Sequence, residues 1–180
     1  MRVIAGEARG RSLEALPGTD VTRPTLSQVK EAMFSIVQFD LPGARVLDLY
    51  AGSGQLGIEA VSRGALSATI VDRSDAAIRV ITANCRAANL AAQCDVRRGE
   101  ADAFLAGCGV QYDLVLMDPP YHNGTVQRLL PLVRDCLAST SALEREITLA
   151  AQMVQDTGLR IKSFYMGGGT PTTLSASQMD

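Results

Sequence analysis

The sequence predicts one α/β domain on a parallel sheet, with a small hairpin at its N-terminus. Two observations carry this prediction. Apolar, strand-like runs alternate with helical patterns from Arg45 onward, and two of these runs end in unusual turns. Strands that alternate with helices are joined by right-handed crossovers and lie parallel, and ligands then bind at their carboxyl ends. A chain of 180 residues with 47% hydrophobic content suits one domain with a buried core.

The N-terminal part predicts two local elements. Extended pieces around Gly6 and Gly10 predict a hairpin within the first 16 residues. Thr25 and Gln28 have capping-box spacing, with Thr25 as the N-cap of a helix that continues to near Phe39.

The remaining elements follow from periodicity and from Gly and Asp at their ends. The expected strands are Arg45–Leu49, Ala68–Val71, Asp95–Arg98 and Asp113–Met117. The expected helices are Gln55–Arg63, Asp75 to about Ala88, and Val126–Leu137.

A glycine-rich turn follows the first strand. Gly52 and Gly54 lack Cβ atoms, so the backbone there can approach a ligand closely, next to the free N–H groups of a helix. Asp72 ends the next strand, where a carboxylate can accept hydrogen bonds from both ribose hydroxyls. Glu100 follows the third strand and either binds an adenine amino group or is a plain acid at a helix N-terminus. The pattern predicts a nucleotide-like cofactor. The alternative is a structural turn with a helix-capping Asp.

The turn after the fourth strand, Asp118-Pro119-Pro120-Tyr121, is the more specific signal. The prolines remove two backbone donors and stiffen the loop, which leaves the Asp118 carboxylate and a carbonyl as acceptors for an amino group. Tyr121 offers a flat face on which a flipped base can stack. Together the two turns predict a methyltransferase that uses S-adenosylmethionine and modifies a base nitrogen. The alternative is a rigid strand-ending turn.

Composition restricts the partners. The net charge of −2 gives no global attraction to nucleic acid, so any contact needs a local patch. Arg2, Arg9 and Arg11 against the single acid Glu7 form such a patch, or a solvated surface. The four cysteines include no C-x-x-C pair, which predicts free thiols, and the single His122 makes a metal site improbable. The sequence shows no leader and no membrane-length apolar run, which predicts a cytoplasmic protein with no membrane partner.

Four pieces of the sequence carry a family resemblance: Arg2–Gly6 with Arg9–Arg11, Arg23–Thr25, Asp48–Gly54 and Asp118–Tyr121. With them, residues 1 to about 138 resemble the RsmD family of 16S rRNA guanine-N2 methyltransferases. The first two pieces discriminate best, because adenine-N6 DNA methyltransferases share the last motif but not these two. The resemblance implies a Rossmann-like methyltransferase sheet, S-adenosylmethionine without a metal, and small-subunit rRNA or the assembling subunit as partner of a monomer.

The resemblance also implies site residues. The cofactor would contact Asp48, Tyr50, Ala51, Gly52, Ser53, Gly54, Asp72, Arg73, Glu100 and Ala101. The target base would lie against Asp118, Pro119, Pro120 and Tyr121. The RNA would contact Arg2, Arg9, Arg11 and Arg23.

The C-terminal part departs from this family. Residues 139–180 resemble a fragment of oxygen-independent coproporphyrinogen oxidase-like radical-SAM enzymes, on the run Gly158–Thr172. The C-x-x-x-C-x-x-C motif of their iron–sulfur cluster is absent, so no cluster and no radical reaction are expected. We therefore expect a methyltransferase domain at 1–138, incomplete at its C-terminal end, and a foreign fragment at 139–180, joined by rearrangement or by true fusion. Its Ala142–Gln155 helix would let the Arg160–Met166 strand pair in parallel with Asp113–Met117.

Two other functions stay open. An adenine-N6 DNA methyltransferase would need a target-recognition region, and no stretch of the sequence is free to supply one. A cofactor-binding remnant without turnover is the non-enzymatic alternative, because the expected sheet is incomplete.

Overall fold

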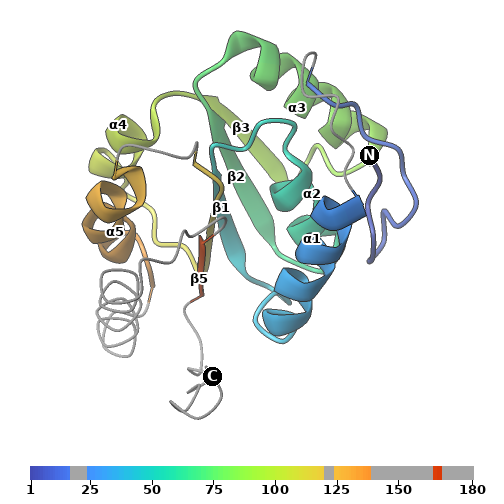
Figure 1. The fold of residues 1–180 in the computed structure, drawn as a ribbon, viewed down its shortest axis with the longest axis horizontal. Helices are drawn as coiled ribbons and strands as arrows, with labels where there is room; N and C mark the ends of the chain where they lie inside the picture. The colour runs from blue at the N-terminus through green and yellow to red at the C-terminus, as the bar shows by residue number, and fades with distance from the viewer. Residues whose placement is uncertain (17–23, 120–123, 139–163, 168–180) are drawn as a thin grey trace.

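A central five-stranded sheet separates two layers of helices (Figure 1). The computed structural model describes residues 1–16, 24–119, 124–138 and 164–167. The strands are β1 (Arg45–Leu49), β2 (Ser67–Asp72), β3 (Cys94–Arg98), β4 (Leu114–Met117) and β5 (Phe164–Gly167). The helices are α1 (Pro24–Ile36), α2 (Gln55–Ser62), α3 (Asp75–Ala87), α4 (Ala101–Ala106) and α5 (Thr125–Asp135).

The sheet confirms the predicted α/β class. Its strand order is β3-β2-β1-β4-β5, and β1 pairs in parallel with both β2 and β4. Starting from β1, the chain adds β2 and then β3 on one side of the sheet. It then returns and adds β4 on the other side of β1. Such a switch point opens a crevice at the carboxyl ends of the strands, where Tyr50, Asp72 and Asp118 follow or end them.

Each face of the sheet has its own core. In β1, Val46 packs on the side of α2 and α3, in one cluster with Ile58 and Ile81. Its neighbour Leu47 lies in the other cluster, with Leu129 of α5. Successive residues of a strand point to opposite faces, so a strand buried on both sides has apolar residues at odd and even positions alike. This is why the strand runs were visible in the sequence. In Figure 1, α1, α2 and α3 cover one face and α4 and α5 the other.

The N-terminal segment, residues 1–16, forms the predicted hairpin as an irregular ladder. Arg2 and Ser12 form an antiparallel bridge, and the Val3 N–H donates to the Arg11 carbonyl at 3.0 Å. The turn contains Gly6 at φ +84°, where a Cβ would stand 1.6 Å from the Ser62 carbonyl oxygen. Only glycine permits this approach of the hairpin to α2.

A buried carboxylate attaches this segment to the domain. Glu59 of α2 is fully buried and accepts hydrogen bonds from the Ile4 and Ala5 N–H groups at 2.8 and 3.0 Å. It also forms ion pairs with Lys30 at 3.3 Å and with Arg63 at 2.8 Å. Every oxygen of the carboxylate therefore has partners, as a buried charge requires.

The last strand corrects one prediction. A strand does pair with β4, but it covers Phe164–Gly167 and runs antiparallel, with Leu114 opposite Gly167 and Met117 opposite Phe164. An exposed sheet edge offers its N–H and C=O groups to a strand of either direction. The direction depends on how the chain returns to the edge, which the apolar pattern does not encode. The predicted helix at Ala142–Gln155 lies outside the described residues.

Smaller differences concern helix ends. Helix α1 begins at Pro24 and ends at Ile36, so Thr25 lies inside the helix rather than at its N-cap. Proline suits the first helical position, because its fixed φ is helical and its missing N–H has no partner there. The short helix α4 begins directly after Glu100, where the alternative reading of that residue expected a helix N-terminus. Within the described residues, no helix has the length and apolar character needed to cross a membrane.

Candidate functional site

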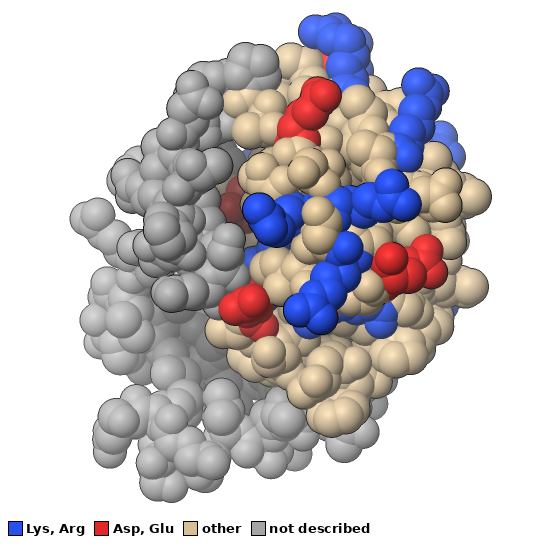
Figure 2. Space-filling view, turned by 90° about the vertical axis from the view of Figure 1, so that its right-hand side faces the viewer, with Lys and Arg blue, Asp and Glu red and all other residues tan. Residues whose placement is uncertain are grey.

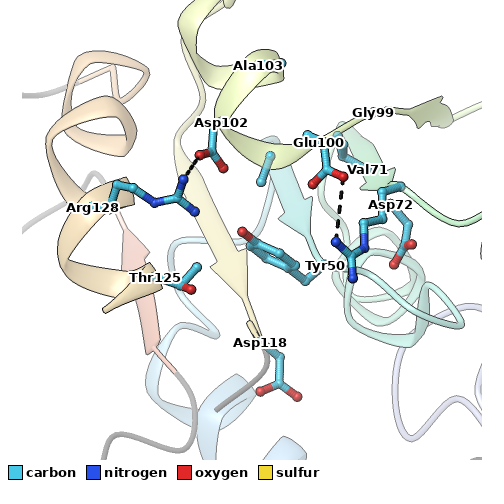
Figure 3. A pocket seen from close by; sticks show the side chains of 12 residues that line it. Tyr50, Val71, Asp72, Gly99, Glu100, Asp102, Ala103, Asp118, Thr125 and Arg128 are labelled. Atoms are coloured by element: carbon cyan, nitrogen blue, oxygen red, sulfur yellow. Dashed lines mark hydrogen bonds and ion pairs between the residues drawn. The ribbon is translucent and has the colours of Figure 1, made fainter. Parts of the chain in front are cut away.

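A cavity of about 740 Å³ opens at the carboxyl ends of β1, β2 and β4 (Figure 3). Its volume is within the range of small-molecule and cofactor sites. Tyr50 follows β1, Asp72 ends β2 and Asp118 follows β4, so the crossing order of the sheet brings them together. The lining residues are Tyr50, Val71, Asp72, Arg73, Gly99, Glu100, Ala101, Asp102, Ala103, Asp118, Thr125 and Arg128.

The structure divides the predicted cofactor residues into two groups. Tyr50, Asp72, Arg73, Glu100 and Ala101 line the cavity. The others, Asp48, Ala51, Gly52, Ser53 and Gly54, are not among its lining residues and form the strand end and the loop behind it.

Asp72 connects this loop to the cavity. Its Oδ2 accepts a hydrogen bond from the Gly52 N–H at 2.9 Å, and its Oδ1 accepts one from the Ser74 N–H at 2.9 Å. An ionised carboxylate has about four acceptor positions, so Asp72 keeps capacity for a ligand's hydroxyl groups. The two backbone bonds orient the carboxylate before any ligand binds.

The loop needs unusual backbone angles. Gly54 precedes α2 at φ +75°, where a Cβ would stand 3.0 Å from the Ile81 side chain. Tyr50 has φ +57°, which is uncommon for a residue with a bulky side chain. Backbone strain of this kind gathers at functional sites. Here it places the Tyr50 ring in the cavity (Figure 3).

Asp48 is a buried acid beneath the loop, with 1% of its surface exposed. Its Oδ2 accepts a hydrogen bond from the Gly57 N–H at 2.8 Å, while Oδ1 has no hydrogen-bond partner within the described part of the chain. Burial raises the pKa of Asp48 to about 7, against the effect of the Gly57 N–H, and the charges of Asp118 and Asp72 add to the rise. The loop thus rests on a carboxyl group that is easily protonated.

Two ion pairs lie on either side of the Tyr50 ring (Figure 3). Arg73 pairs with Glu100 at 3.7 Å, and Arg128 of α5 pairs with Asp102 of α4. Asp102, Thr125 and Arg128 were not predicted as site residues. Asp102 and Arg128 are 26 residues apart, on two helices without a motif, so only the packing of α4 against α5 joins them.

Asp118 stands at the rim, beyond the end of β4 (Figure 3). The residue is exposed as a whole, yet the surrounding protein withdraws its carboxyl group from water far enough to raise its pKa. Pro119 next to it is buried. Of the predicted base-binding residues, Pro120 and Tyr121 lie outside the described residues.

The predicted RNA contacts lie apart from the cavity, on the N-terminal segment. Arg2, Arg9 and Arg11 are exposed, and Arg23 lies outside the described residues. Figure 2 shows basic side chains spread over the face of the molecule that carries this segment. Acidic side chains lie among them on the same face, so the RNA contact of the three arginines stays a prediction.

Other predicted features can be placed briefly. All four cysteines are free, and Cys85 and Cys136 are buried. Among the residues that the structure describes, no three His, Cys, Asp or Glu side chains gather in a way that could hold a metal ion.

Comparisons with known proteins agree on one group. The family model described as conserved hypothetical protein 95 matches residues 1–161. The protein YlbH of Bacillus subtilis (strain 168) is 40% identical over 136 residues, which are 74% of this chain and 73% of YlbH. Ribosomal RNA small subunit methyltransferase D of Escherichia coli (strain K12) is 35% identical over 135 residues, which are 75% of this chain and 67% of that protein. The structure of yhhF from Escherichia coli matches with a TM-score of 0.68 and 34% identity, over 76% of this chain and 75% of that one.

The family match also bears on the C-terminal part. It extends to residue 161 and so runs past Ala138, after which a foreign fragment was predicted. The domain boundary at this residue stays a prediction.

Proposed function

The chain belongs to the conserved hypothetical protein 95 family, and from this premise we propose that it transfers a methyl group from S-adenosylmethionine to the N2 of a guanine in small-subunit ribosomal RNA. One observation carries the proposal. Asp72 and Glu100, which suit a nucleoside, line the same cavity as Asp118, which suits an amino group. Donor and acceptor of a methyl group must lie in one such space, because transfer needs the reacting atoms about 3–3.5 Å apart.

The cofactor half rests on the hydrogen-bond acceptors and the aromatic side chain that line the cavity. The Asp72 carboxylate, oriented by the Gly52 and Ser74 N–H groups, accepts hydrogen bonds from the ribose hydroxyls. Glu100 accepts a hydrogen bond from the adenine amino group, and Tyr50 contributes an aromatic surface. S-adenosylmethionine supplies a methyl group on a positively charged sulfur, so that transfer neutralises a charge.

The acceptor half rests on Asp118. The N2 lone pair of guanine is delocalised into the ring, which makes the nitrogen a poor nucleophile. Hydrogen bonds from its two N–H groups to the Asp118 carboxylate and to the Pro119 carbonyl orient the nitrogen and favour its pyramidal form. Partial withdrawal from water raises the pKa of Asp118, which makes its carboxylate a stronger base for the proton that the nitrogen loses.

The contact with RNA rests on the N-terminal segment. Arg2, Arg9 and Arg11 are exposed there and pair with phosphates of the RNA. The affinity of the protein for RNA should therefore fall as the salt concentration rises. The partner is small-subunit rRNA, naked or in the assembling subunit, and the protein acts as a monomer in the cytoplasm.

Methyl transfer from labelled cofactor tests the proposal. The substrates are small ribosomal subunits that lack the modification, the matching naked rRNA, and duplex DNA. We expect label in N2-methylguanine of the rRNA. Label in N6-methyladenine of DNA would support the adenine-N6 alternative instead, and cofactor binding without transfer to any substrate would identify an inactive remnant.

A further inference from the structure

Asn84 of α3 is a buried polar side chain that the proposed chemistry does not use. It is 1% exposed, and its amide makes three hydrogen bonds. Its Oδ1 accepts from the Glu14 N–H at 2.7 Å, and its Nδ2 donates to the Glu14 carbonyl at 3.0 Å and to the Ser53 carbonyl at 2.9 Å. The partners determine the orientation of the amide, because an N–H group needs an acceptor and a carbonyl needs a donor.

The partners of Asn84 belong to two different sites. Glu14 is near the end of the N-terminal segment, which carries Arg2, Arg9 and Arg11. Ser53 lies in the glycine-rich loop, next to Gly52, whose N–H orients Asp72. One side chain thus links the proposed RNA-binding segment to the loop of the proposed cofactor site.

A second contact joins the same two segments. The Ser53 hydroxyl donates to the sulfur of Met1 at 3.8 Å, across a sequence separation of 52 residues. By contrast, Glu59 and Ser62 attach the N-terminal segment to α2, and within the described residues neither side chain hydrogen-bonds the loop at 50–54. Asn84 is therefore a buried hydrogen-bonded connection between segment and loop, and the Ser62 side chain hydrogen-bonds the segment and not the loop.

We propose that Asn84 is a positioning residue that couples RNA binding by the N-terminal segment to cofactor binding by the loop at 50–54. This inference rests on the proposed function. A ligand that orders one segment also orders the other through the shared amide, so the second ligand has less conformational entropy to remove. The coupling is reciprocal: rRNA raises cofactor affinity by the same factor by which the cofactor raises rRNA affinity.

Equilibrium dialysis of labelled S-adenosylhomocysteine, with and without saturating unmethylated small subunits, measures this factor. S-adenosylhomocysteine is what remains of the cofactor after methyl transfer, so its use excludes turnover during the measurement. In the unmodified protein we expect the subunits to tighten binding by roughly fivefold or more, the lower end of ordinary allosteric coupling. A factor of one in the unmodified protein would overturn the inference, whatever the variants do.

Two substitutions at Asn84 locate the coupling. Asn84→Ala should reduce the factor to near one. Asn84→Asp keeps an acceptor for the Glu14 N–H but places a carboxylate oxygen against the Glu14 and Ser53 carbonyls, so it should reduce the factor likewise. Ser62→Ala is the matched control. It removes hydrogen bonds to Ala5 and Ala8 of the same segment at 2.6 and 3.0 Å, yet should keep the factor within about twofold. An undiminished coupling factor in Asn84→Ala would contradict the proposed role. Equal losses of the factor in Asn84→Ala and Ser62→Ala would contradict it as well.

The same experiment separates this inference from the proposed function. If the subunits are bound and methylated but the factor is one, only the coupling fails. If the unmodified protein neither binds nor methylates the subunits, the proposed function fails and the coupling fails with it.

Discussion

Asp118 is the residue on which the proposed transfer depends most. In the proposed transfer it orients the acceptor amine, so Asp118→Asn should lower the transfer rate by about 10²–10⁴-fold. The affinity for S-adenosylhomocysteine should stay within a few-fold, since the carboxylate does not hold the cofactor. Single-turnover kinetics and a binding titration on the same samples measure both quantities.

The control for Asp118 lies at the other end of the same strand. Asp113 precedes β4, pairs with Arg45 at 3.4 Å and does not line the cavity. Asp113→Asn should therefore keep the transfer rate within a few-fold. Near-normal turnover of the Asp118 variant would remove this carboxylate from the mechanism.

Asp48 predicts a pH dependence of stability. Its pKa is about 7 in the folded protein, above the ordinary value of 3.8, so between these values the folded state holds a proton that the unfolded state has lost. The stabilisation is complete below pH 4 and is lost as the pH rises to 7. Relative to Asp48→Asn, the unmodified protein should lose at most about 1.4 kcal/mol of unfolding free energy per pH unit. Urea unfolding of both proteins from pH 5 to pH 8 measures the difference, and a constant difference would show that Asp48 is ionised throughout.

At the scale of elements, the attachment of the N-terminal segment to α2 depends on Glu59. Removing this carboxylate leaves Lys30 buried without its partner. Burial already lowers the pKa of Lys30, and Glu59 counteracts that effect. Glu59→Ala should therefore destabilise the protein by roughly 3–5 kcal/mol. Amide exchange at Ile4 and Ala5 should also become faster, because these groups donate to Glu59.

A glutamate on α1 provides the comparison for this variant. Glu31 is exposed, and Glu31→Ala should change the unfolding free energy by no more than about 0.5 kcal/mol. Denaturant unfolding and hydrogen exchange on both variants decide the point. Equal effects would mean that burial of the Glu59 ion pairs contributes nothing.

At the scale of the whole molecule, β5 covers one edge of the sheet. Its antiparallel pairing with β4 closes a strand that otherwise has neighbours on one side only. A chain cut after Ala138 lacks β5, so the β4 amides that point away from β1 should exchange faster and the protein should aggregate more readily. Amides of β2, which lies between β1 and β3, should keep their protection. Unchanged exchange throughout β4 would show that β5 does not stabilise the sheet.

The sequence alone determined the fold class and the place of the candidate site. Strand β4 is a continuous apolar run, and β1 and β2 each have apolar residues on both faces, so they can be recognised without knowing their neighbours. The turns after β1 and β4 were also visible in the sequence, because glycine and proline mark turns by their own backbone preferences. Parallel strands bring their carboxyl ends to one edge, and so the meeting of Tyr50 and Asp72 at one cavity also followed from local pattern.

Only the tertiary structure decided which polar groups meet across the chain. Asn84 and Glu59 lie in helices where no sequence pattern marks them. Each nevertheless accepts a hydrogen bond from a backbone N–H group more than 50 residues away in the sequence. The pairing of Asp102 with Arg128 depends on the packing of α4 against α5, and the antiparallel direction of β5 depends on the return of the chain to the edge of β4. Periodicity reports which face of an element is buried, whereas these contacts depend on the relative placement of whole elements, which no local spacing contains.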